Sequence, residues 1–111
     1  MKIVSLADLT EEGVSHNPEI RKRVMLRLGD VPQLTNFTQS RLAPGQVASA
    51  HQHADMFEVF FVQAGEGVMR VDDVEQRLEA GVCVMVEPGE AHEIACTGAG
   101  ELVLLYFGVE V

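Results

Sequence analysis

Apolar and polar residues alternate along this chain over short runs, and the 3.6-residue spacing of amphipathic helices is almost absent after residue 30. Gly, Pro, Asp and Asn separate the runs from one another. Strands are predicted at residues 23–28, 35–42, 47–53, 56–63, 67–71, 75–79, 82–87, 92–97 and 102–108. Many short strands with turn residues between them are typical of an all-β sandwich or barrel.

The segments between the runs favour defined turns. Residues 43–45 (APG) predict a turn, and Pro88-Gly89 suits the two central positions of a type II turn. Asp72-Asp73 predicts a hairpin. The first 20 residues are less regular, and residues 6–13 (LADLTEEG) favour a helical turn. Asn17-Pro18 argues against a helix that continues through it.

Length and charge restrict the class of protein. A chain of 111 residues predicts one domain, with residues 1–30 forming an N-terminal segment that includes the first strand. Hydrophobic residues make up 47%, but no run is long enough to cross a membrane. The net charge of −9 disfavours nucleic acid and anionic lipid as partners. Acidic residues follow the N-terminus too soon for a secretory signal, so we expect a cytoplasmic protein.

The two cysteines, one basic cluster and His16 have simple structural interpretations. Cys83 and Cys96 have no zinc spacing and form no CxxC pair, so reduced, buried thiols are expected. The basic cluster at residues 21–23 (RKR) is interpreted as a solvated strand face, with an anion-binding patch as the alternative. His16 is expected to be a surface or turn histidine.

Two histidines lie one residue apart in GQVASAHQHADMFEVFFVQAG, residues 45–65. On a strand, His51 and His53 point to the same face with Cα atoms about 6.6 Å apart, so both imidazoles can reach one ion. Glu58 follows at an odd offset and can join them only if the chain turns at residues 54–55. Taken alone, two such histidines are also compatible with unrelated surface positions.

This stretch resembles the first motif of the cupin superfamily in the spacing of Gly45, the two histidines, the glutamate and Gly65. A second stretch, GVCVMVEPGEAHEIAC at residues 81–96, resembles the second cupin motif. Its matching positions are Gly81, Gly89 and His92. Motif 1 therefore spans residues 45–65 and motif 2 spans residues 81–96.

Two positions of the second motif depart from the family pattern. Glu87 stands where the family has proline, and Pro88 follows one place later. Cys96 stands where an asparagine is often found. The first departure is expected to reshape the turn without moving His92 relative to Gly89, and the second removes a polar group.

The resemblance implies an all-β double-stranded β-helix, or jelly-roll barrel, of short antiparallel strands. It also implies one divalent transition metal bound by His51, His53, Glu58 and His92. Three imidazoles and one carboxylate without a thiolate suit Fe, Mn, Ni, Co, Cu or Zn. Affinity order does not select among these metals, because geometry and supply decide which is bound.

Strand parity predicts which other side chains face the metal cavity. Residues that alternate with Glu58 or with His92 share their face. For Cys96 and Tyr106, packing in the core is the alternative to a polar role in the cavity. The predicted cavity-lining residues are Phe60, Val62, Ile94, Cys96 and Tyr106.

The opposite face of the strand at residues 56–63 carries Phe57, Val59 and Phe61. An antiparallel sheet that faces water normally shows polar residues there, so this face is expected to be covered, most simply by a second subunit. The cupin resemblance also implies a homodimer.

The fold does not determine the function, and two classes remain open. One is a small metalloenzyme of the dioxygenase, isomerase or lyase type, in which the metal acts on a small metabolite as a Lewis acid or oxygen site. No further histidine is expected in the barrel to serve as a base. The other class is a non-catalytic binding or sensor module for a small ligand, with a structural metal.

Overall fold

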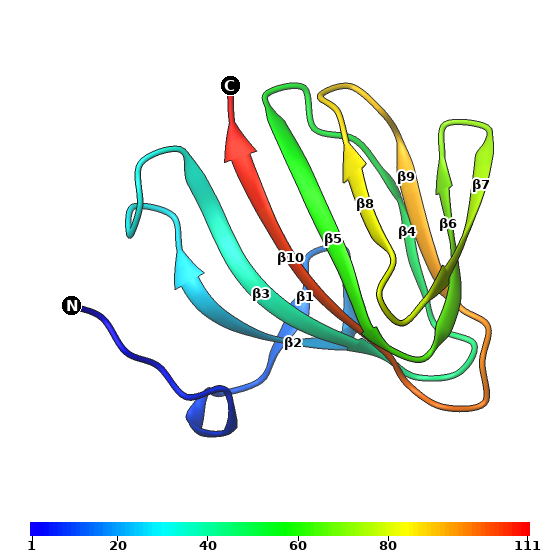
Figure 1. Ribbon diagram of the computed structural model, residues 1–111, viewed down its shortest axis with the longest axis horizontal. Helices are drawn as coiled ribbons and strands as arrows, with labels where there is room; N and C mark the ends of the chain where they lie inside the picture. Colours follow the sequence, from blue (N-terminus) through cyan, green and yellow to red (C-terminus); the bar gives the residue numbers. More distant parts are fainter.

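The computed structural model describes residues 1–111 and contains two antiparallel sheets that face each other (Figure 1). The larger sheet has the strand order β1-β2-β3-β10-β5-β8, and the smaller has the order β4-β9-β6-β7. The elements are η1 (Leu6–Asp8), β1 (Glu12–Val14), β2 (Asn17–Arg27), β3 (Leu34–Leu42), β4 (Val47–His51), β5 (Met56–Ala64), β6 (Glu66–Val71), β7 (Val74–Glu79), β8 (Cys83–Val86), β9 (His92–Cys96) and β10 (Leu102–Glu110). The predicted all-β jelly roll is confirmed.

The strands predicted from alternation are all present, and the differences lie at their ends. β2 begins at Asn17, well before the predicted start, and pairs with a strand, β1, that the sequence analysis did not predict. Pro18 is compatible with this because proline tolerates the start of a strand and holds the residue before it in an extended conformation. β4 ends at His51, two residues earlier than expected, and a bend follows at residues 54–55.

The predicted turns are present and have the backbone geometry that their residues favour. The amide of Gln46 donates to the carbonyl of Ala43 at 3.0 Å, and the amide of Glu90 donates to that of Glu87 at 3.1 Å. Gly89 has φ +85°, as the third position of a type II turn requires. This turn brings motif 2 back toward motif 1, since the amide of Gly89 donates to the carbonyl of His53 at 2.7 Å.

The hydrophobic core fills one end of the space between the sheets. Leu102 and Leu42 are cross-strand partners that are both almost completely buried. Gly67 belongs to the same end, where an added Cβ would lie 2.5 Å from the carbonyl oxygen of Ala95. The largest fully buried side chains in the cluster include Ile20, Leu42, Met69, Leu78, Leu102 and Leu104. The opposite end, where β9 begins and β10 ends, remains available for a site.

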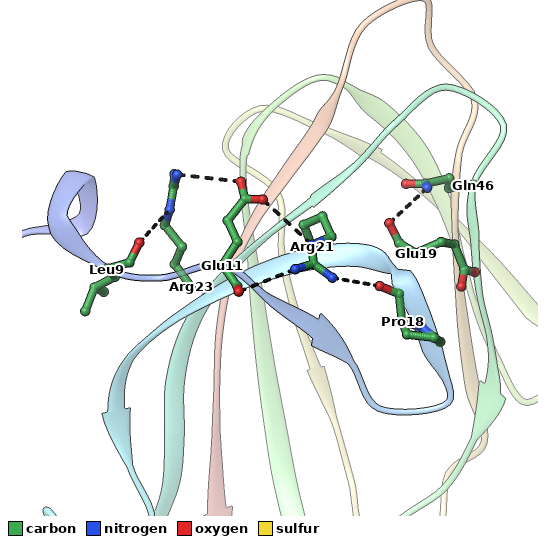
Figure 2. Close-up of polar contacts among 7 residues, drawn as sticks. All are labelled: Leu9, Glu11, Pro18, Glu19, Arg21, Arg23 and Gln46. Atoms are coloured by element: carbon green, nitrogen blue, oxygen red, sulfur yellow. Dashed lines mark hydrogen bonds and ion pairs between the residues drawn. The ribbon is translucent and has the colours of Figure 1, made fainter.

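The N-terminal segment is attached to the outside of β2 by two arginines (Figure 2). Arg23 donates from Nε to the carbonyl of Leu9 at 3.2 Å, and Arg21 donates from Nη2 to the carbonyl of Glu11 at 3.4 Å. The carboxylate of Glu11 lies 3.7 Å from Arg21 and 3.6 Å from Arg23. These contacts hold the chain before β1 against the larger sheet.

Residues 21–23 were expected to form one solvated strand face, but Lys22 does not lie on it. Successive side chains on a strand point to opposite faces, so Lys22 lies on the side opposite to its arginine neighbours. It pairs in register with Ser40, which is buried inside the barrel. Lys22 is half-buried there.

The outside of the larger sheet carries an apolar surface, which we call the outer patch. Its members alternate with inward-facing residues and neighbour one another across β3, β10, β5 and β8. Phe61 is 42% exposed and Met85 is 56% exposed. The patch consists of Phe37, Phe57, Val59, Phe61, Met85, Leu105 and Phe107. No helix in the structure has the length and apolar character of a membrane span.

Candidate metal centre

The four residues predicted as metal ligands meet at the open end of the barrel. His51 ends β4 and His92 begins β9, and the two are cross-strand partners in the smaller sheet. His53 lies just after β4, before the bend that turns the chain. Glu58 comes from β5 of the larger sheet and is 6% exposed. The smaller sheet and its bend thus bring three imidazoles toward a carboxylate from the facing sheet.

The distances within this quartet suit a single ion. One ligand atom from each of the four residues lies within 4.8 Å of the others. Oε1 of Glu58 is 3.0 Å from Nε2 of His92 and 3.4 Å from Nε2 of His53. Around a six-coordinate ion with bonds of about 2.1 Å, neighbouring donor atoms lie about 3.0 Å apart and opposite ones about 4.2 Å. The four residues could therefore hold a metal.

Backbone carbonyls orient two of the imidazoles. Nδ1 of His51 lies 3.0 Å from the carbonyl oxygen of Ser49, and Nδ1 of His92 lies 3.2 Å from that of Glu90. A carbonyl accepts but cannot donate, so each ring carries its proton on Nδ1. Nε2 is then left as the lone-pair donor, which is how metal-binding histidines are commonly held.

Two buried atoms of the quartet have no hydrogen-bond partner. Oε1 of Glu58 and Nε2 of His92 are both unsatisfied, although only 3.0 Å separates them. Their distance suits a hydrogen bond but their relative direction does not. A buried carboxylate oxygen that faces a neutral imidazole nitrogen without a bond is unfavourable unless a positive charge lies between them, either a metal ion or a proton on the ring. This pair is the observation that best fits a metal.

The surroundings shift the pKa values of two histidines in opposite directions. Crowding by neighbouring rings, 4.3 Å away in the case of His92, removes water from the His51 ring although the residue itself is exposed. This burial lowers the pKa of His51 despite its bond to the Ser49 carbonyl. Burial alone would also lower the pKa of His92, but the Glu58 carboxylate and the Glu90 carbonyl outweigh it and raise that pKa.

The quartet lies between a small inner chamber and a wider mouth. The chamber, of about 70 Å³, is mostly apolar and is lined by Glu58 and His51 among others. The mouth, of about 430 Å³, contains all of the quartet except His92 among its lining residues. A small molecule at the mouth can thus reach the quartet directly, while apolar walls lie behind it.

Three of the five residues predicted to line the cavity do so, namely Phe60, Ile94 and Tyr106. The Phe60 ring stacks on Tyr106 with centroids 5.4 Å apart and lies 5.8 Å from the His92 ring. Val62 and Cys96 also face inward but lie deeper, in the hydrophobic core. Cys96 packs in the core and its thiol donates to the carbonyl of Gly100 at 3.3 Å, whereas Cys83, also expected to be buried, is exposed.

Several polar residues at the mouth were not predicted. His16 lies exposed in the turn between β1 and β2 with a φ of 69°, as expected of a surface or turn histidine, and this turn also places it at the rim of the cavity. Lys22 and Asn36 enter from β2 and β3, and Gln52 lies between the two motif histidines. No short-range pattern marks them, because their position depends on how the first strands pair.

Comparison with known proteins agrees with this architecture. Residues 39–108 match the model of the family described as Cupin domain. The chain belongs to the cupin family. The match begins in β3 and ends in β10, so it includes both histidine-bearing segments and the strand that carries Glu58.

Among curated proteins, this cupin is 32% identical over 69 residues to an oxalate-binding protein of Thermotoga maritima. The aligned part covers 62% of this chain and 57% of that relative. Among solved structures, a predicted oxalate decarboxylase from Thermotoga maritima superposes with a TM-score of 0.89 and 24% identity, over 99% of this chain and 100% of the other. The polyketide cyclase RemF from Streptomyces resistomycificus superposes with a TM-score of 0.83 and 19% identity, over 98% and 79%. These two structures share the fold.

Proposed function

We propose that this cupin holds one divalent transition metal with His51, His53, Glu58 and His92, and that it is a small metalloenzyme acting on a small metabolite. The unsatisfied pair of Glu58 and His92 carries this proposal, because a dication between them would remove the cost of two buried acceptors that face each other. Three imidazoles and one carboxylate are compatible with Fe, Mn, Ni, Co, Cu or Zn.

The reaction belongs to the dioxygenase, isomerase or lyase type. When bound, the metal supplies Lewis acidity toward a substrate oxygen, or a redox-active centre if it is iron. Phe60 and the apolar chamber walls exclude water behind the quartet, which strengthens polar interactions with the substrate. The Nδ1 bonds of His51 and His92 fix the direction in which the site presents its donors.

Tyr106 acts as a hydrogen-bond donor and not as a base. Burial raises its pKa strongly and the charge of Glu58 adds to this, against a smaller opposite effect of the Thr38 hydroxyl. The phenol therefore keeps its proton at neutral pH. His16 is the one imidazole outside the quartet that lines the mouth.

The second candidate is a binding module without catalysis, and one observation favours it. The curated relative is described as an oxalate-binding protein, although the alignment covers only 57% of that relative. In this role the same four residues hold a metal that recognises a small chelating anion. Conversion of the ligand, measured by mass spectrometry of the bound and released molecule, separates the two functions.

The first experiment is elemental analysis of protein purified without chelator or metal-affinity resin. We expect about one transition metal per chain, with the vacant fraction filled on titration. Titration of protein treated with chelator then gives the affinity by calorimetry. No metal after purification and none bound on titration would contradict the proposal.

We further propose that the protein is a homodimer that buries the outer patch. Aromatic and aliphatic residues gather on one nearly continuous surface of the larger sheet, where Phe61 and Met85 are exposed and the others are half-buried. A contiguous apolar surface of this kind usually marks an interface, and a two-fold dimer buries the same patch on both subunits. Light scattering coupled to size exclusion would measure the mass, and a monomer at micromolar concentration would contradict this proposal.

A further inference from the structure

Lys22 is the one side chain of the basic cluster that lies inside the barrel. It lines the mouth together with His51, His53 and Glu58. It also lines a second hollow of about 430 Å³, which extends along β2 and β3 beside the mouth. Asn36 and Tyr106 border both spaces, so the two hollows are adjacent at these residues. A ligand on the quartet can therefore extend toward Lys22.

The Lys22 ammonium has no hydrogen-bonded or ion-paired partner in the protein. Glu12 is its cross-strand neighbour, but the Glu12 carboxylate pairs with Arg27 instead. The hollow beside it has no acidic residue in its lining, which includes two cations, Lys22 and Arg27. Arg27 is paired with Glu12, so in a chain with net charge −9 it is Lys22 that makes this wall locally basic next to the candidate metal centre.

Polar groups around Lys22 can complete an anion site. The side chain of Asn36 donates to the Thr35 hydroxyl at 3.1 Å and accepts from the Thr38 hydroxyl at 2.8 Å. An amide nitrogen has two donors, so one N–H of Asn36 remains free for a ligand. The Tyr106 hydroxyl keeps its proton and faces the same space.

We infer that Lys22 binds a second anionic group of the ligand, a carboxylate or a phosphate, at a distance from the metal-chelating end. This inference rests on the proposed function. A dication with the single carboxylate of Glu58 leaves one positive charge at the quartet, and Lys22 adds another. The ligand class that matches both ends is a small dianion, such as a hydroxy acid with a further acidic group. A lysine ammonium suits either anion because it acts as a point charge.

The test compares ligands that differ only in the second anionic group. Lactate and glycerate chelate through their α-hydroxycarboxylate alone, whereas malate, 2-hydroxyglutarate and 3-phosphoglycerate add a carboxylate or a phosphate. Their dissociation constants are measured by calorimetry on protein loaded with Mn²⁺ or Ni²⁺. We expect at least one dianion to bind about tenfold tighter than its matched monoanion, as a charge-assisted contact allows. The probe with the larger advantage identifies carboxylate or phosphate as the group.

In Lys22→Met this advantage should disappear, while the affinities for lactate, glycerate and the metal stay unchanged. Lys22→Arg should retain most of the advantage. Arg77→Met is the matched control, since it removes one exposed charge from β7 on the smaller sheet. Melting temperatures verify that each variant is folded.

Metal uptake is measured first, because it distinguishes failure of the proposed function from failure of the Lys22 inference. Wild-type protein that binds neither Mn²⁺ nor Ni²⁺ contradicts the proposed function and this inference together. Normal metal uptake with no dianion advantage in the wild type contradicts the inference alone. The inference is also contradicted if Lys22→Met still binds the dianion more tightly than the matched monoanion. It is contradicted as well if Arg77→Met loses this difference in affinity to the same extent.

Discussion

The two faces of β5 reverse the usual distribution of side chains. The inner face carries a charged residue, Glu58, which is 6% exposed, followed by Phe60 and Val62. The outer face carries Phe57, Val59 and Phe61, and Phe61 is 42% exposed. Carboxylates are almost never buried without a partner, and large aromatic residues rarely gather on a free surface.

We have proposed a different partner for each face, a metal for the inner one and a second subunit for the outer one. The inner face has unsatisfied polar atoms, which a bound cation would satisfy. The outer face has exposed apolar area, which contact with another protein surface would remove from water. If both proposals hold, neighbouring residues of one strand serve two binding events through opposite faces.

The largest difference between the faces should appear in stability. Phe60→Ala removes a buried ring next to His92 and Tyr106, and we expect the free energy of unfolding to fall by about 3–5 kcal/mol. Phe61→Ala, one residue away, should change it by less, and only at concentrations at which the dimer forms. Urea unfolding at two protein concentrations measures both. Equal losses in the two variants would remove the distinction between the faces.

The inner face alone should control the metal. His92→Ala removes a donor from the quartet, and we expect the metal dissociation constant to rise by at least about a hundredfold while the fold is kept. His16→Ala serves as the matched control, because it deletes an imidazole at the rim. Calorimetric titration compares the two. Wild-type affinity in His92→Ala would exclude this residue as a ligand.

The outer face alone should control association. Phe61→Glu introduces a charge into the outer patch, and we expect the dimer dissociation constant to rise about thirtyfold or more, with metal content unchanged. Val74→Glu is the control, because Val74 is 70% exposed on β7, away from the patch. Sedimentation velocity over a concentration series gives both constants. The idea fails if the two variants associate equally well.

The smallest effect concerns pH and involves only the inner face. The pKa of His92 is raised, so the folded metal-free protein gains stability below 6.5 that is lost as pH rises through the raised value. The pKa of His51 is lowered, so its contribution is present above 6.5 and is lost as pH falls below it. Together they place a shallow stability maximum near pH 6.5.

Urea unfolding with chelator present, from pH 5.5 to 8, would measure this maximum. The alkaline decline should vanish in His92→Ala and the acidic decline in His51→Ala. Phe61→Glu should leave both the acidic and the alkaline decline in stability unchanged. A profile that His92→Ala does not alter would show that this ring does not titrate with folding.

Much of the architecture could be predicted because its determinants are local. Alternation and turn residues predicted nine of the strands, and the structure confirms the jelly roll. The spacing of HQH and Glu58 specified four residues whose donor atoms meet within 4.8 Å. Residues 54–55 bend the chain as that spacing required. Such features depend on a few consecutive residues and on strand parity.

The remainder depends on pairing between distant strands. Parity places Val62 and Cys96 on the inner face, but it does not tell how far along the barrel the cavity extends, and both lie in the core. β1 was not predicted because its three residues form a strand only beside β2. The same pairing turns Lys22 inward and brings His16 to the rim. Those positions follow from tertiary structure and not from any local pattern.

The bonds from Nδ1 of His51 and His92 end on main-chain carbonyls, in each case two residues before the histidine. Every residue type has that carbonyl, so no single substitution at Ser49 or Glu90 deletes the orienting group. The orientation of the two rings is therefore set by the main chain, and the side chains around them can change without altering it. Related proteins with this fold can therefore bind a different ligand by changing the cavity-lining residues, while the histidines keep the same orientation.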